Sequence, residues 1–139
     1  MVNGAIEWGH RTTNDSIRTS LHTAGLDDIY WCFALMHSNF INMRWCRQGE
    51  TTTPYEKWQN VKPSFNKLHI FGATLYIHDP WANKLTTNAL SGIFLGFGAS
   101  TVVLYYLDPI KSTIKRTHHA KIDELQVGGN DLTPGSRLV

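Results

Sequence analysis

The sequence contains few cysteines, few charged residues and no long apolar segment, and each shortage excludes a class of protein. Charged residues make up 17% and hydrophobic residues 42% of the 139 residues, which is typical of a globular chain. No apolar run approaches the roughly 20 residues that a membrane-spanning helix needs, and no signal peptide is recognisable. We therefore expect an intracellular protein with no membrane contact, in the nucleus or the cytoplasm.

The two cysteines, Cys32 and Cys46, are typical of a reducing compartment rather than of a disulfide-stabilised fold. If one helix carries both, they lie about 21 Å apart, which is too far for a disulfide bond. Free cysteines usually pack among apolar side chains. We therefore expect two free thiols, with at least one of them in the core.

Motifs for cofactor or metal binding are also absent. No glycine-rich phosphate loop precedes a helix, and no motif pairs a serine nucleophile with a histidine base. His118 and His119 would point to opposite faces of a strand, so they are poorly placed to share one ion. We expect neither a metal site nor a bound cofactor in this chain.

The first 60 residues have the pattern of helices. Residues 6, 13, 17, 21 and 24 fall on one helical face, and Gly25 supplies a stop signal. A second helix is expected over residues 28–44, which contain neither proline nor glycine. Thr53, Pro54 and Glu56 have the spacing of a third helix N-terminus, and we expect this short helix to end at residues 62–63.

The following residues change to the two-residue period of strands. Four strands are expected, at residues 68–78, 90–97, 101–107 and 113–122, with a bend or bulge at Gly72. Short strands separated by glycine corners and tight turns are typical of a small barrel. The predicted fold class is therefore α+β, with helices first, a small β-barrel second and a mobile tail from residue 125.

Basic residues outnumber acidic residues in the predicted barrel. Residues 61–121 contain seven basic and two acidic side chains, a net charge of +5, which permits nucleic-acid binding. The candidate nucleic-acid-binding residues are Lys62, Lys67, Lys84, Lys111, Lys115, Arg116 and Lys121.

The last predicted strand would arrange some of these charges on one face. Alternation places Lys115, Thr117, His119 and Lys121 on the same side, about 6.8 Å apart, which is similar to the spacing of successive phosphates. Such a face could follow a nucleic-acid backbone. The alternative interpretation is a solvated outer face whose lysines protect an edge strand.

Several sequence blocks occur in a characteristic order. They are NGAIEWGHRTT at 3–13, TAGLDDIYWCFAL at 23–35, TTPYEKWQNVKPSFNKLHIFGATLYIH at 52–78, NKLTTNALSGIFLGFG at 83–98, LYYLDP at 104–109 and KIDE at 121–124. Over residues 3–124 the chain resembles the integrase region of copia-type retrotransposon Pol polyproteins. The resemblance implies a helical remnant of an RNase H-like integrase core with a linker helix at 1–60. It further implies an SH3-like β-barrel at 61–124 and a flexible tail at 125–139.

Integrases of this family hold two divalent metal ions, Mg²⁺ or Mn²⁺, on two aspartates and one glutamate. The resemblance places Glu7 at the position of the catalytic glutamate. It implies that both aspartates lie upstream of Met1, so Glu7 would be vestigial. Residues 8–10 also depart from the family, which usually has arginine, a basic residue and asparagine there. We therefore expect a truncated integrase fragment that is not an enzyme.

The resemblance and the charge together predict an accessory fragment that takes part in DNA integration through weak, non-specific binding of DNA or RNA. Other pieces of the Pol polyprotein are further expected partners. One alternative is a peptide-binding SH3-like module, and another is a degenerate relic without a selected function. The aromatic residues that would bind a peptide are Tyr76, Trp81, Tyr105 and Tyr106.

Overall fold

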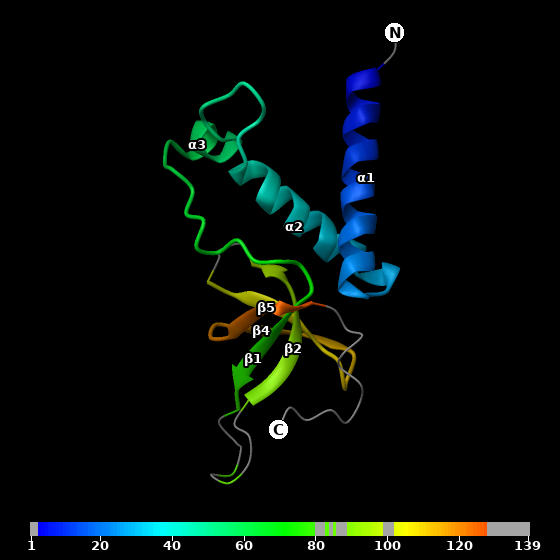
Figure 1. Ribbon diagram of the computed structural model, residues 1–139, viewed down its shortest axis with the longest axis vertical. Helices are drawn as coiled ribbons and strands as arrows, with labels where there is room; N and C mark the ends of the chain where they lie inside the picture. Colours follow the sequence, from blue (N-terminus) through cyan, green and yellow to red (C-terminus); the bar gives the residue numbers. More distant parts are fainter. Residues whose placement is uncertain (1–2, 80–82, 84, 86–88, 99–101, 128–139) are drawn as a thin grey trace.

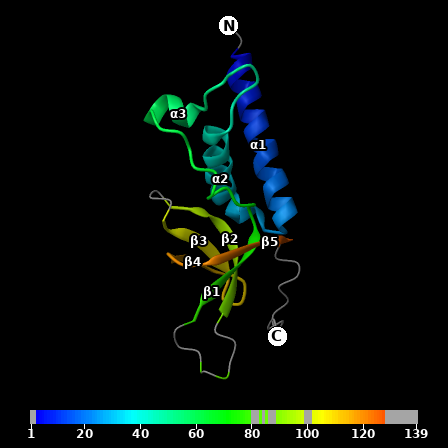
Figure 2. The same ribbon diagram turned by 60° about the vertical axis from the view of Figure 1, so that its left-hand side comes forward.

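Helices occupy one end of the molecule and an antiparallel sheet occupies the other (Figure 1). The structure is a computed structural model that describes residues 3–79, 83, 85, 89–98 and 102–127. α1 and α2 come together near the sheet and diverge away from it (Figure 1). A second view places α3 at the far end of α2 from the sheet (Figure 2). The predicted α+β fold class is confirmed.

The first helix, α1, spans Gly4–Ala24 and ends at the predicted stop signal. Gly25 adopts the left-handed conformation there, with φ of 63°. Leu21 and Ala24 near the C-terminal end of α1 are buried, whereas Ile6 and Trp8 in its first half are 57% and 71% exposed. Only the second half of α1 therefore packs against the rest of the molecule.

The second helix, α2, spans Trp31–Arg44 and follows a 3₁₀ turn, η1, at Asp28–Tyr30. The third helix, α3, spans Pro54–Gln59 and ends slightly earlier than expected. Its N-terminus has the predicted cap, because the backbone N–H of Glu56 donates to Thr53 Oγ1 at 3.1 Å.

The sheet has five antiparallel strands in the order β4-β3-β2-β1-β5. Their bounds are β1 Ala73–His78, β2 Ala89–Phe97, β3 Leu104–Asp108, β4 Thr113–Thr117 and β5 Lys121–Val127. The chain passes from β4 to β5, at opposite edges, within residues 118–120. Four residue steps reach at most about 14 Å, whereas the edges of a flat five-stranded sheet lie about 19 Å apart. The sheet must therefore curl, as in a small SH3-like barrel.

The prediction of one strand over residues 113–122 was wrong. A bend divides this segment, with Thr117 Oγ1 accepting a hydrogen bond from the backbone N–H of His119 at 3.3 Å. Lys115 therefore lies on β4 and Lys121 on β5, and the expected single face of alternating residues does not exist. The tail expected from residue 125 was also placed too early, since β5 continues to Val127 and pairs with β1 there.

Two apolar cores lie on opposite faces of β2. Inside the barrel, Phe94 packs with residues from β1 and β3. On the outer face, Ile93 and Leu95 pack against residues of α1 and α2. The helices therefore cover one outer side of the barrel. The buried members of the inner core are Ala73, Leu75, Phe94, Leu104 and Tyr106. Those of the outer core are Leu21, Ala24, Ala34, Phe71, Ile93, Leu95 and Leu107.

Both cysteines are exposed, so the expectation that Cys32 or Cys46 would lie in the core was wrong. Cys32 lies in the first turn of α2 and Cys46 follows the end of that helix, whereas the core position in the first turn is taken by Ala34. Across the described ranges, none of the helices is long and apolar enough to cross a membrane.

Candidate nucleic-acid interface

Six of the seven basic residues predicted to bind nucleic acid lie in the described part of the chain, and most of them lie on different elements. Lys62 is exposed in the segment between α3 and β1, and Lys111 is exposed in the turn between β3 and β4. Arg116 is exposed on β4, opposite Tyr105 of β3. Lys84 lies outside the described residues. Of the described residues, Lys62, Lys111 and Arg116 line neither of the two concave sites described below.

Lys115 is engaged within the fold. Its Nζ lies 2.8 Å from Asp108 Oδ2, and Asp108 Oδ1 accepts hydrogen bonds from the backbone N–H groups of Ile110 and Lys111. Burial raises the pKa of the Asp108 carboxyl, but these hydrogen bonds lower it by more, so the pKa lies below its ordinary value. Lys115 therefore closes the turn between β3 and β4, and we do not assign it to the interface.

Lys67 and Lys121 are both exposed, and both line a hollow of about 470 Å³ at one end of the barrel. We call these two exposed lysines its rim. Two histidines, His69 and His118, add imidazole rings, and the other described lining residues are apolar. We call this feature the basic hollow. Its lining residues are Lys67, His69, Phe97, Val102, Leu104, His118, Ala120, Lys121 and Ile122.

Local turns bring these residues to one end of the barrel. The N–H of Leu68 donates to Phe65 O at 3.1 Å, which holds Lys67 in a turn before β1. The N–H of Gly98 donates to Val103 O at 2.7 Å and returns the chain from β2 to β3. The bend at residues 118–120 then delivers Lys121 to the first position of β5, where it pairs with Tyr76 of β1.

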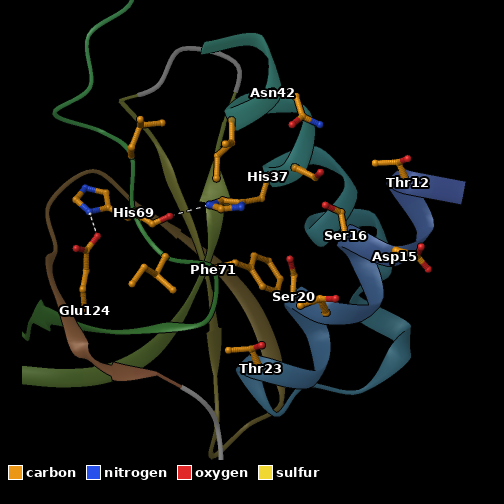
Figure 3. A pocket seen from close by; sticks show the side chains of 15 residues that line it. Thr12, Asp15, Ser16, Ser20, Thr23, His37, Asn42, His69, Phe71 and Glu124 are labelled. Carbon is orange, nitrogen blue, oxygen red and sulfur yellow. Dashed lines mark hydrogen bonds and ion pairs between the residues drawn. The ribbon is translucent and has the colours of Figure 1, made fainter. Parts of the chain in front are cut away.

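One carboxylate, Glu124, lies close to the basic hollow. Its Oε1 is 3.0 Å from His69 Nδ1, and the carbonyl oxygen of His69 accepts a hydrogen bond from His37 Nε2 at 2.8 Å (Figure 3). Burial lowers the pKa of His37, whose ring packs against Phe71 at a centroid distance of 5.5 Å. The carboxylate of Glu124 thus pairs with the imidazole of His69. Glu124 is not among the described lining residues of the hollow.

A second, larger cavity of about 750 Å³ lies between α1 and α2, and residues 68–71 and Glu124 complete its described lining (Figure 3). Its described lining contains hydroxyl side chains such as Ser16 and Ser20, together with Asp15 and Glu124. No lysine or arginine is among these residues. Since carboxylates repel phosphate and hydroxyls carry no charge, this cavity suits a nucleic acid less well than the basic hollow does.

Glu7 lies in the exposed first turn of α1. Among the described residues, no group of three or more His, Cys, Asp or Glu side chains is placed to hold a metal ion. A single exposed carboxylate does not fit a centre for two Mg²⁺ or Mn²⁺ ions, which needs several oxygen ligands.

The aromatic residues considered for peptide binding do not form one exposed surface in the part of the chain that is described. Tyr106 is 8% exposed and belongs to the inner core. Tyr105 packs against Phe33 of α2, at a ring-centroid distance of 6.1 Å. Tyr76 is partly buried on β1, and Trp81 lies outside the described residues. Tyr105 and Tyr106 therefore serve mainly to pack the barrel and the helices.

No local sequence pattern predicts that His69 and His118 line the same hollow as Lys67 and Lys121. The pairing of β5 with β1 brings them together, and strand pairing between distant segments leaves no local spacing signal. The only available indication was the excess of basic residues in the barrel half.

Comparison with known proteins identifies relatives over most of the chain. It is 25% identical over 134 residues to the retrovirus-related Pol polyprotein from transposon TNT 1-94 of Nicotiana tabacum, covering 90% of this chain and 10% of the polyprotein. It is 26% identical over 128 residues to the corresponding polyprotein from transposon RE1 of Arabidopsis thaliana, covering 88% of this chain and 8% of the polyprotein. No protein-family profile and no solved structure matches the chain. The resemblance to retrotransposon Pol polyproteins is thus confirmed, and the chain is related to a short segment of them.

Proposed function

We propose that this chain is a non-catalytic, accessory nucleic-acid-binding segment of a retrotransposon integrase within a Pol polyprotein, and that it acts in DNA integration through the basic hollow. The observation that carries the proposal is the placement of Lys67 and Lys121 on one rim, although they come from distant parts of the chain. The similarity to two retrotransposon Pol polyproteins supports the proposal that the chain belongs to such a polyprotein.

Two lysines support weak and non-specific binding. Neutralising about two duplex phosphates predicts that the logarithm of the association constant falls with the logarithm of salt concentration, at a slope of about −2. Non-specific binding of this kind has dissociation constants on the order of 10⁻⁴–10⁻⁶ M. Phosphate contacts carry no sequence information, so duplexes of different sequence should bind alike.

The non-catalytic part of the proposal rests on Glu7. Two-metal phosphoryl transfer requires several ligands to fix both ions, and the described residues supply one exposed glutamate in this region. An incubation of the chain with a labelled DNA end and Mn²⁺ should therefore give no cleavage or joining. Metal-dependent cleavage that disappears in Glu7→Ala would overturn this part.

The binding part is tested by fluorescence anisotropy with a random-sequence duplex at several salt concentrations. We expect Lys67→Glu/Lys121→Glu to lose affinity by about tenfold or more. The matched control, Lys62→Glu/Lys111→Glu, makes the same change in net charge outside the hollow and should lose much less. Equal losses in the two variants would show a diffuse charge effect, and an affinity independent of salt would exclude the proposal.

A further inference from the structure

The lining of the basic hollow also contains buried and partly buried apolar side chains, which we call its floor. Leu104 is 7% exposed at the floor, where Phe97 and Ile122 are partly buried. Val102 is 55% exposed at the wall. Phosphate groups alone would meet the lysines and leave this apolar surface in water. The complementary ligand therefore joins an anion to a flat, weakly polar group.

A base-paired duplex does not present such a group. Its bases are stacked inside and its phosphates lie outside, so a concave site would meet only the backbone. In a single strand, an unpaired base can leave the stack and lie on apolar and aromatic side chains, while the adjoining phosphates remain beside cations. The volume of about 470 Å³ lies within the range of about 300–1,000 Å³ that is usual for small-ligand sites.

We infer that the basic hollow binds an unpaired nucleotide of a single-stranded nucleic acid. The base lies on the floor formed by Phe97 and Leu104, and the adjoining phosphates face Lys67 and Lys121. This inference rests on the proposed function and adds the form of nucleic acid that the site selects. A free mononucleotide has the same chemistry, so the experiment must separate it from a strand.

The test compares four probes by fluorescence anisotropy or competition: short oligothymidylate, the same strand with abasic sites, a duplex of equal length, and thymidine monophosphate. Because one stacked base changes affinity by about fivefold or more, oligothymidylate should bind at least about fivefold more tightly than the abasic strand or the duplex. The mononucleotide should compete much more weakly, because it offers one phosphate to two lysines.

A variant separates base contacts from phosphate contacts. Val102→Ser/His118→Ala removes apolar and ring surface from the hollow and keeps both lysines. It should lower oligothymidylate affinity by about fivefold and duplex affinity by clearly less, because the stacked bases of a duplex do not lie on these side chains. The control, Ile114→Ser/His119→Ala, changes exposed residues outside the described lining and should bind like the parent.

The outcomes distinguish this inference from the proposed function. Equal binding of single strand, duplex and abasic strand, all lost in Lys67→Glu/Lys121→Glu, would overturn the single-strand inference and leave the proposed function standing. Mononucleotide binding as tight as that of the strand would assign the hollow to a free nucleotide instead. If no probe binds, both the single-strand inference and the proposed function are wrong.

Discussion

Ala24, the last residue of α1, lies directly against the backbone of Gly72, which leads into β1. Gly72 has φ of +81°, and its N–H donates to Phe94 O at 2.9 Å. A Cβ atom at this position would overlap the side chain of Ala24. The end of α1 therefore contacts the barrel through two small residues, Ala24 and Gly72, and a side chain on Gly72 would prevent this close approach.

Gly72→Ala should destabilise the junction between the helices and the barrel. The left-handed backbone costs an L-residue about 1–2 kcal/mol, and the overlap with Ala24 adds about 1–3 kcal/mol. Gly49→Ala is the matched control, since Gly49 has φ of +84° with no neighbour within 4 Å of the added carbon. Urea unfolding should show the larger loss for Gly72→Ala. Equal losses would mean that the helix end can move away freely.

Stability should decrease at mildly acidic pH because of His37. Burial lowers the folded pKa of His37 below the ordinary value of 6.5, so the unfolded chain takes up a proton more readily. The loss of stability caused by His37 is absent above about pH 6.5. It grows as the pH falls from there toward the folded pKa, by at most about 1.4 kcal/mol per pH unit.

Urea unfolding at about pH 7 and about pH 5 measures this effect. In His37→Gln, the decrease between the two conditions should be smaller than in the parent, whereas His22→Gln, at an exposed position, should retain it. An unchanged decrease in His37→Gln would assign the acid sensitivity to other groups.

Asp108→Ala should loosen the turn between β3 and β4. It removes an ion pair with Lys115 and two hydrogen bonds from backbone N–H groups, together worth about 1–2 kcal/mol. The lowered pKa of Asp108 means that its stabilising effect is present near neutral pH and is lost as pH falls through its folded pKa.

Lys115→Ala should have a smaller effect on unfolding, below about 1 kcal/mol, because the backbone hydrogen bonds to Asp108 remain. It should also leave nucleic-acid affinity nearly unchanged, since Lys115 closes the turn. A loss of affinity as large as that of Lys121→Ala would place Lys115 in the interface after all.

The helices and most strands could be predicted because their signals are local. Gly25 ends α1, and the Thr53–Glu56 spacing begins α3, through contacts between residues a few positions apart. The glycine at 72 indicated a bulge, and the pairing of β1 with β5 does shift register between Ala73 and Thr74. Such features need no knowledge of tertiary contacts.

The break between β4 and β5 could not be predicted, because residues 118–120 contain no glycine or proline to indicate it. Its cause is tertiary, since β5 leaves β4 to pair with β1. The candidate site depends on the same pairing, which places Lys121 near Lys67. Composition could show that the barrel half is basic, but it could not show which lysines share a site.

The most direct test is nuclear magnetic resonance of the full chain during titration with oligothymidylate and, separately, with a duplex. If the basic hollow is the interface, the largest amide shift changes will fall on Lys67 and residues 118–122, and they will weaken as salt is added. Residues such as Ser16 and Asn42 in the cavity between α1 and α2 will remain unchanged. Changes concentrated in that cavity, or none with either nucleic acid, would contradict the account.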